Sequence, residues 1–478
     1  MNRKVVFYTT GQIIGVEGLC MLLSAGVSLI YKEYSGIYLL ISAFTAEAIY
    51  FLTWLFRPKK DENVIFAKEG FVTVALSWIV MSLIGALPFY ISGEIPDYID
   101  CFFETASGLS TTGASILDNV EALSHGMLFW RSFTHWIGGM GVLVLVLAIA
   151  PASGRTIHMA RAEMPGPVIG KLVPKMKDTA KILYIMYLIL TVVLTCLLML
   201  GGMSAFESIV HAFGTAGTGG FGVKPDSIAS YSNYIQWVIT VFMLLFGVNF
   251  NLYYLMLVRH FSQALKSSEL WCYIGIVVAF TVAITINVFP LYNNFGDSIR
   301  NSAFQVASII STTGYSTVSI NDLPQFSKGL LFILMFFGGC AGSTAGGLKI
   351  SRVMLLFKSI GSKLKSTLYP RTVNTVKFEG KKVENETVNG VAIYFAIYMV
   401  CIAALFIVLS IQPFGLESNI TATVSTFNNV GPAYGIAASS YSAYSGISKL
   451  CMSFAMLLGR LEIYPLLILF SPSTWIKK

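Results

Sequence analysis

Residues 103–115 read Phe-Glu-Thr-Ala-Ser-Gly-Leu-Ser-Thr-Thr-Gly-Ala-Ser, an apolar, small-residue stretch that runs into a turn rich in threonine and glycine. Three later segments end in the same way, and each follows a stretch too short to cross a bilayer. We call these segments the four glycine turns: Thr111-Thr112-Gly113-Ala114, Gly217-Thr218-Gly219-Gly220, Thr312-Thr313-Gly314-Tyr315 and Asn429-Val430-Gly431-Pro432. They recur about every hundred residues, which indicates a fourfold internal repeat.

The composition is that of a polytopic helical membrane protein. Of the 478 residues, 55% are hydrophobic and 12% are charged, and this charged fraction is about half that of a soluble domain. Several stretches lack Asp, Glu, Lys and Arg, and each reaches the roughly 20 residues that a spanning helix needs: 70–93, 132–154, 182–206, 227–258, 270–296, 329–348 and 387–416. We therefore expect an all-α membrane protein whose apolar N-terminus is a retained first span rather than a cleaved signal peptide.

The repeat divides the chain into five parts. Residues 1–57 are expected to form two N-terminal transmembrane helices, at about 5–31 and 36–56. The pore repeats then cover 58–150, 151–258, 259–358 and 359–478, and cytoplasmic connectors precede the second and fourth. Each repeat should contain a span, a short helix, a glycine turn and a second span, and the second spans are expected at 127–150, 232–258, 327–358 and 443–470. Four such repeats would surround one central pore.

The distribution of basic residues predicts the orientation. With Met1 in the cytoplasm, the predicted inner segments hold 25 of the 32 Lys and Arg residues, and six lie outside, Arg131 among them. This asymmetry follows the positive-inside rule. The formal net charge of +8 therefore reflects topology, and we expect no nucleic-acid partner, since no basic strip interleaved with aromatic residues is present.

The glycine turns are expected to form a selectivity filter. A short helix that enters the membrane halfway and leaves through a glycine turn is tolerated only if protein or a wet cavity surrounds it. Backbone carbonyls around a pore can replace the hydration shell of a cation, and glycine can take the positive φ that aligns them. The residues predicted to bind the cation are Thr111, Thr112, Gly113, Gly217, Thr218, Gly219, Thr312, Thr313, Gly314, Asn429, Val430 and Gly431, with positive φ expected at Gly113, Gly219, Gly314 and Gly431. The alternative is that these small residues only permit close helix packing.

The segments around these turns resemble those of the Trk/Ktr/HKT superfamily of potassium transporters. The resemblance is carried by residues 103–115, by His211–Phe221 (HAFGTAGTGGF), by Ser311–Ser316 (STTGYS) and by Asn428–Pro432 (NNVGP). The two extra N-terminal spans make the chain similar to the TrkH/TrkG branch. Residues 135–141 (HWIGGMG) also look like the family, although its first residue there is more usually Gln.

The resemblance implies several properties. Gly113 in the first glycine turn implies a preference for potassium over sodium, with K⁺ as the transported ion and no cofactor in this chain. It further implies a homodimer with one pore per chain and a cytosolic ring of nucleotide-binding, TrkA-like regulatory subunits. The basic connectors 151–181 and 349–386 would form the docking face for that ring.

Residues 338–348 are expected to form a gate, which we call the intramembrane loop. Its glycines and small polar residues should interrupt the last span of the third repeat: Gly338, Gly339, Gly342, Ser343, Thr344, Gly346 and Gly347. The family has such a loop at the matching place, and the alternative is a close-packed helix crossing. Lys349 and Arg352 would anchor its cytoplasmic end. Arg460 is costly at membrane depth and is expected to face the pore beneath the filter; the family resemblance also carries an arginine at this position.

Other features carry no transport role. Glu104 and Glu207 lie in short helices and are expected to tie them to the surrounding spans, whereas Glu17 and Glu47 in the N-terminal spans are left without a role. Residues 217–222 match G-x-G-x-x-G but lack the strand and helix of a dinucleotide site. The seven cysteines form no C-x-x-C pair and are expected to be buried apolar side chains.

These observations predict a multi-pass protein of the bacterial inner membrane that takes up potassium through a channel-like, gated pore. One alternative is a proton- or sodium-coupled potassium symporter. Another, from a different class, is a membrane enzyme or solute sensor. It would need converging acid, base or metal-ligating residues at membrane depth, and the sequence offers none.

Overall fold

The computed structural model describes the chain except residues 59–65, 142–175, 372–373 and 477–478. Within the described residues, six helical segments are long and apolar enough to cross a membrane. They are α1 (Arg3–Ile30), α2 (Ser35–Leu55), α3 (Ala67–Gly85) with its continuation α4 (Leu87–Ser92), α9 (Met176–Leu200), α14 (Ser268–Tyr292) and α18 (Asn385–Leu409).

Four short helices lie where the sequence analysis expects them, and each ends at a glycine turn. They are α5 (Tyr98–Leu109), α10 (Ala205–Gly217), α15 (Phe295–Ile310) and α19 (Leu416–Phe427). Polar side chains begin three of them by accepting the free N–H groups of the first turn. Asp97 caps α5, Ser204 and Glu207 form a reciprocal capping box on α10, and Asn294 caps α15.

The second span of each repeat, which follows the glycine turn, is shorter or more broken than predicted. It consists of α6 (His125–Gly139), α11 (Asn233–Phe246) with α12 (Phe250–Leu257), α16 (Gln325–Leu334) with α17 (Ile350–Leu368), and α20 (Gly446–Arg460) with α21 (Tyr464–Phe470) and α22 (Pro472–Trp475). The spans predicted at 232–258 and 443–470 are therefore not continuous helices. The first bends by 91° between α11 and α12, and the second breaks where Glu462 and Ile463 take positive φ.

The first of these breaks is stabilised by a distant segment. Between α11 and α12, the Gly247 carbonyl accepts a hydrogen bond from the Cys340 N–H (2.9 Å), and the Phe250 N–H donates to the Gly342 carbonyl (3.1 Å). Backbone groups freed by a helix break at membrane depth need such partners. The intramembrane loop supplies them.

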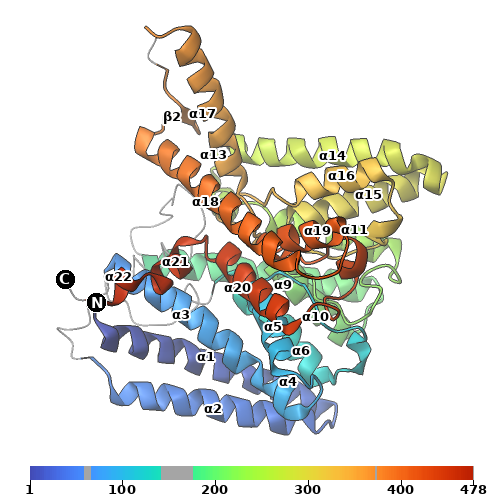
Figure 1. Cartoon of the computed structure of the whole chain (residues 1–478). Helices are drawn as coiled ribbons and strands as arrows, with labels where there is room; N and C mark the ends of the chain where they lie inside the picture. The colour runs from blue at the N-terminus through green and yellow to red at the C-terminus, as the bar shows by residue number, and fades with distance from the viewer. Residues whose placement is uncertain (59–65, 142–175, 372–373, 477–478) are drawn as a thin grey trace.

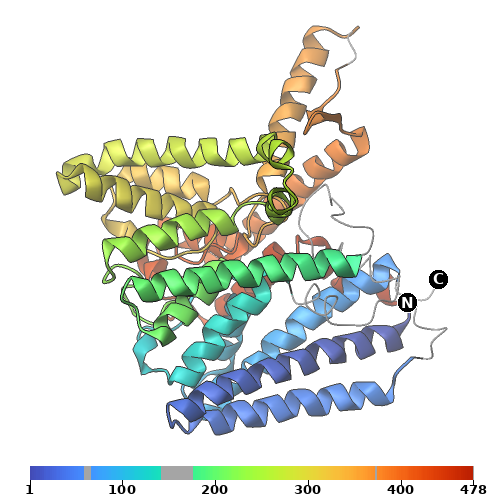
Figure 2. The ribbon, with the colours of Figure 1, turned by 180° about the vertical axis from the view of Figure 1, so that it is seen from behind.

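Figures 1 and 2 show how the helices are arranged. Helix α1 packs against α2 and α3 at one edge of the molecule, and α14 packs against α15 and α16 at the opposite side. Helix α5 lies between α6 and α20. Helix α17 projects beyond the other helices together with a small hairpin of β1 (Lys377–Phe378) and β2 (Lys381–Lys382), which pairs Phe378 with Lys381. A short helix, α13 (Phe261–Leu265), precedes α14.

Two carboxylates outside the spanning segments fix the start of α6. Glu33 accepts hydrogen bonds from the His125 and Gly126 N–H groups (3.0 and 3.2 Å) and contacts the His125 ring (2.7 Å). Partial burial raises the pKa of Glu33, but these hydrogen bonds outweigh it and hold the pKa below its ordinary value. Glu94 accepts from the Ser124 N–H (3.0 Å). Negative charge at a helix N-terminus is favourable, so both residues set the position of α6.

Most of the predicted basic connector 151–181 lies outside the described residues, as does the end of the predicted span 127–150. The other large connector, 359–386, carries the last part of α17 and the hairpin, neither of which the sequence analysis expected.

Candidate functional site

The four short helices end in the same backbone conformation. One residue in each turn takes a left-handed φ between 56° and 57°, and the glycine two residues later has a φ between 77° and 100°. The residue between them donates its N–H to the carbonyl five residues earlier, as in a Schellman motif. These donors are Thr112, Gly219, Thr313 and Val430. The left-handed residues are Thr111, Thr218, Thr312 and Asn429.

The glycine of each turn faces a carbonyl of the next turn, and the glycine of the fourth turn faces a carbonyl of the first. A Cβ atom on each glycine would collide with the carbonyl oxygen of the next turn. Gly113 faces Gly219, Gly220 faces Thr313, Gly314 faces Val430, and Gly431 faces Thr112. Each turn thus contacts the next, and the fourth contacts the first. The four segments, which lie far apart in the sequence, come together in one ring.

The register of the second turn differs from the prediction by one residue. Gly220, not Gly219, has the positive φ, and Gly217 is the last residue of α10. The reason is the hydrogen bonding at the end of α10, where Gly219 donates to the Gly214 carbonyl (2.8 Å) and so takes the place of Thr112 in the first turn. Gly219 also packs its Cα against the His135 ring, where a Cβ atom would not fit.

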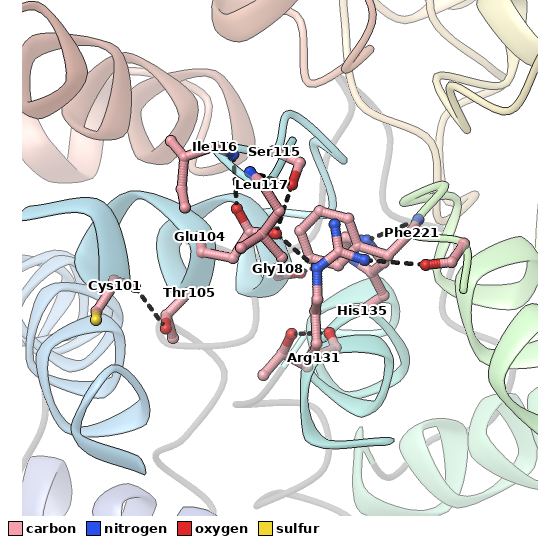
Figure 3. A network of polar contacts seen from close by, with 12 residues as sticks. Cys101, Glu104, Thr105, Gly108, Ser115, Ile116, Leu117, Arg131, His135 and Phe221 are labelled. Carbon is pink, nitrogen blue, oxygen red and sulfur yellow. Dashed lines mark hydrogen bonds and ion pairs between the residues drawn. The ribbon is translucent and has the colours of Figure 1, made fainter. Parts of the chain in front are cut away.

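A buried ion pair connects the first two turns (Figure 3). Glu104 on α5 accepts a hydrogen bond from Arg131 Nε on α6 (2.6 Å), and both side chains are almost fully buried. Glu104 also accepts from the Ser115 hydroxyl and the Ile116 N–H (both 2.9 Å). Arg131 donates to the Gly222 carbonyl (3.1 Å) and lies 3.5 Å above the Phe221 ring. The ion pair therefore holds in place the residues that follow the first and second glycine turns.

His135 makes a second connection between the same turns (Figure 3). Its Nδ1 lies 2.7 Å from the Gly108 carbonyl, and its Nε2 lies 3.3 Å from the Phe221 N–H. A neutral ring with the proton on Nδ1 satisfies both contacts, because Nδ1 then donates and Nε2 accepts. The family more usually has Gln at this position, and the histidine makes both hydrogen bonds here.

Two buried tyrosines brace the remaining turns. Tyr315 donates its hydroxyl to the Phe221 carbonyl (3.2 Å), and Tyr441 donates to the Gly431 carbonyl (2.8 Å). The Tyr315 hydroxyl thus joins the third glycine turn to the residue that follows the second. The Tyr441 hydroxyl holds the fourth turn itself. Polar groups buried with all their hydrogen bonds made tend to fix a single arrangement.

A cavity of about 230 Å³ lies on one side of the ring. Its lining includes the four glycines with positive φ and residues that follow them, such as Ser115, Phe221 and Tyr441. The exposed Asp118 also lines this cavity. Among the described residues, no three His, Cys, Asp or Glu side chains gather as a metal site would require.

The intramembrane loop lies on the other side of the ring. The Thr218 hydroxyl donates to the Thr344 carbonyl (3.0 Å), and the Gly346 N–H donates to the Thr312 hydroxyl (2.7 Å). A Cβ atom on Gly346 would lie 2.8 Å from the Asn428 carbonyl oxygen. The loop thus touches three short-helix ends through residues that precede the turn glycines. It follows that the turns separate the cavity from the loop.

Arg460 joins the intramembrane loop to two helix ends. It donates to the Thr344 carbonyl (2.7 Å) in the loop and to the Gly138 and Gly139 carbonyls (2.6 and 2.7 Å) at the end of α6. A cation is favourable at a helix C-terminus. Glu462 forms a short ion pair with Arg352, whose guanidinium lies 4.0 Å above the Tyr394 ring.

Comparisons with known proteins agree with this architecture. Residues 41–271 and 291–478 match the family model TrkH, described as a cation transport protein. The chain belongs to the TrkH family. It is 36% identical to the Trk system potassium uptake protein TrkH of Escherichia coli K12, over 99% of this chain and 100% of that protein. It is 33% identical to the E. coli K12 protein TrkG, over 99% and 98% of the two chains.

A solved structure of this family has the same fold. The crystal structure of the potassium transporter TrkH from Vibrio parahaemolyticus superimposes with a TM-score of 0.90 and 31% sequence identity, and covers 100% of both chains. The resemblance to the TrkH/TrkG branch is confirmed. TrkH-family proteins are membrane transporters of cations rather than enzymes, so the alternative of a membrane enzyme is dropped.

Some residues of this TrkH-family site were not found from the sequence. Arg131 was counted among the outer charges but is buried beside the ring. Glu104, which was expected to tie α5 to a surrounding span, pairs with Arg131 on α6. A charged residue inside an apolar segment is a signal for function, and Arg131 lies inside the span predicted at 127–150, so this signal was present in the sequence. Lys349, predicted as an anchor, is buried and donates to the Ala345 carbonyl within the same segment.

Proposed function

We propose that this protein takes up potassium across the bacterial inner membrane as the pore-forming, channel-like subunit of a Trk system. The supporting observation is the closed order in which the turn glycines face neighbouring carbonyls. Under this proposal, four pseudo-symmetric repeats surround one pore, and K⁺ exchanges its water for the carbonyl oxygens of the ring. With one correction of register, the potassium-binding segments are 111–113, 218–220, 312–314 and 429–431.

The chemistry of the ring favours a monovalent cation. The four turns contain no carboxylate, whereas calcium and magnesium sites draw on Asp and Glu oxygens. Neutral carbonyls suit a weakly hydrated ion that must also leave again. The relatives named potassium uptake proteins and the potassium transporter of known structure support K⁺ as the cargo.

We assign the intramembrane loop and Arg460 to the gate. The loop lies directly beneath three short-helix ends, and Arg460 holds its Thr344 carbonyl. A guanidinium beneath the ring repels a cation that leaves it. The remaining parts of the proposal are a cytoplasmic N-terminus, a homodimer with one pore per chain, and a cytosolic TrkA-like regulatory subunit docked on the basic connectors. The Trk system names of the relatives and the sidedness of the basic residues support them.

An Arg460→Ala variant should conduct more than the wild type. The substitution removes both the positive charge of the Arg460 guanidinium beneath the ring and the hydrogen bond that holds the Thr344 carbonyl. Arg460→Lys is the matched control, because it keeps the charge but cannot reach three carbonyls at once. Single-channel recording in planar bilayers measures the effect, and an unchanged current in Arg460→Ala would remove the arginine from the gate.

Rubidium uptake into liposomes, with sodium as the competitor, tests the transport proposal itself. Liposomes that contain the wild type and are loaded with potassium should take up external rubidium, driven by the outward potassium gradient. External sodium should compete only weakly with this uptake. A flux that responds to an imposed proton or sodium gradient would favour the coupled symporter instead.

A Gly113→Ser variant should admit sodium. The added Cβ atom meets the Gly219 carbonyl, and φ at this residue is +77°, a region that serine rarely adopts. The carbonyls of the first two turns must therefore move, and the fit to dehydrated potassium is lost. The ratio of rubidium to sodium flux measures this, and an unaltered ratio counts against the ring as the filter.

A further inference from the structure

A single carboxylate oxygen binds both the intramembrane loop and the helix that follows it. Glu269 lies in the first turn of α14 and is buried. Its Oε1 accepts hydrogen bonds from the Ala341 N–H (2.8 Å) and the Ser351 N–H (3.0 Å). Ser351 lies in the first turn of α17, whose N–H groups have no partner within their own helix. Glu269 therefore caps α17 from another helix and holds the loop at the same time.

The hairpin on the proposed cytosolic side holds the helix that carries Glu269. Glu379 sits in the two-residue turn between β1 and β2, where it and Gly380 both have positive φ. Its carboxylate accepts from the Ser268 and Glu269 N–H groups (3.2 and 3.1 Å) and from the hydroxyls of Ser267 and Ser268 (both 3.1 Å). Glu379 thus caps the N-terminus of α14, a position where negative charge is stabilising.

The same hairpin is attached to α17. Phe378 packs with Leu355 of α17 and Val391 of α18, and Lys358 of α17 donates to the Lys377 carbonyl (3.0 Å). The hairpin therefore binds α14 and α17, the two helices that meet at the intramembrane loop. On its outer side Lys377, Lys381 and Lys382 are exposed.

We propose that Glu379 and Glu269 are positioning residues that keep the intramembrane loop beneath the ring. Glu379 fixes the start of α14 and therefore the place of Glu269. Glu269 Oε1 in turn holds the backbone N–H groups of Ala341 and Ser351. A cytosolic partner that binds the exposed lysines and pulls the hairpin from α14 would release the loop. This inference rests on the proposed function, in which the loop is the barrier to potassium.

A Glu379→Ala variant, reconstituted in liposomes without any partner protein, should take up rubidium faster than the wild type. The loss of these hydrogen bonds should raise the uptake rate on the order of tenfold. The ratio of rubidium to sodium flux should not change, because the hydrogen bonds of Glu379 go to the start of α14 and not to a glycine turn. Glu379→Gln keeps an acceptor oxygen and should return the rate toward that of the wild type.

Glu386→Ala is the matched control, because it removes one exposed carboxylate from the first turn of α18 in the same region. It should behave as the wild type does. Glu269→Ala should match Glu379→Ala, Glu269→Gln should not, and the double alanine variant should exceed neither single variant, because the two residues act in series. Uptake by Glu379→Ala at or below the rate of the wild type overturns the proposal.

Amide hydrogen exchange over residues 338–351 follows the loop without any need for transport. Protection there should fall in Glu379→Ala and stay unchanged in Glu386→Ala. Equal protection in the wild type and both variants overturns the positioning role. A wild type that takes up no rubidium would reject the transport proposal, whereas the exchange measurement would still decide whether Glu379 and Glu269 hold the loop.

Discussion

A Gly220→Ala variant should lose rubidium uptake, whereas a Gly222→Ala variant should keep it. Gly220 has a φ of +78°, and a Cβ atom there would meet the carbonyl oxygen of Thr313. The left-handed conformation alone costs an L-residue about 1–2 kcal/mol. The collision adds to this and displaces an oxygen of the ring. Uptake in reconstituted liposomes should therefore fall to that of protein-free vesicles.

Gly222 is the matched control because it lies in the same segment and lines the same cavity. Its nearest neighbours would be 3.7–3.8 Å from an added Cβ atom, which is ordinary contact, and its φ is not positive. Size-exclusion profiles of both variants should match that of the wild type, so that a loss of uptake is separated from a loss of folding. If a monodisperse Gly220→Ala protein retained rubidium uptake and its preference over sodium, the ring would not be the filter.

The sequence was sufficient to locate the short helices and the turns. A chain in a bilayer must satisfy its backbone hydrogen bonds internally, so an apolar stretch of about a dozen residues that ends in glycine has few possible structures. Helix α5 runs from Tyr98 to Leu109, directly before the first glycine turn. The matching helices of the other repeats also run up to their glycine turns.

The details of the turns could not be predicted, for two physical reasons. Gly217, Gly219 and Gly220 permit more than one register in the second turn. The hydrogen bond from Gly219 to the Gly214 carbonyl and the contacts with Gly113 and Thr313 select the observed one. The left-handed residues Thr111, Thr218 and Thr312 give no signal either, because threonine disfavours that conformation. Such strain persists only where the surrounding structure imposes it.

The helix breaks depend on long-range contacts that local sequence patterns do not encode. No proline marks the 91° bend between α11 and α12; the bend exists because Gly247 and Phe250 bond to the intramembrane loop about 90 residues later. The break after α20 places Glu462 against Arg352 in the same way. The pairing of Glu104 with Arg131 likewise follows no spacing rule, since the two residues lie on different helices.

Arg131→Met should destabilise the protein more than any other loss of a salt bridge described here. The Arg131 and Glu104 side chains are only 3% and 0% exposed, and removing one partner of a buried pair costs about 3–5 kcal/mol because the other charge is left unpaired. Arg131 also holds the Gly222 carbonyl and covers the Phe221 ring, so selectivity should fall together with stability. Thermal unfolding in detergent and the ratio of rubidium to sodium flux measure the two effects.

Arg300→Met provides the control for this prediction. Arg300 and Asp297 form an ion pair of the same length, 2.6 Å, but their side chains are 14% and 38% exposed, and such surface pairs contribute only about 0–1 kcal/mol. A second variant, Arg131→Met with Glu104→Gln, removes the unpaired charge yet keeps an oxygen for the Ile116 N–H. It should recover part of the lost stability without restoring selectivity, because the contacts of Arg131 with the second turn remain absent. If Arg131→Met unfolded at the same temperature as Arg300→Met, the buried pair would not be what holds the first two turns together.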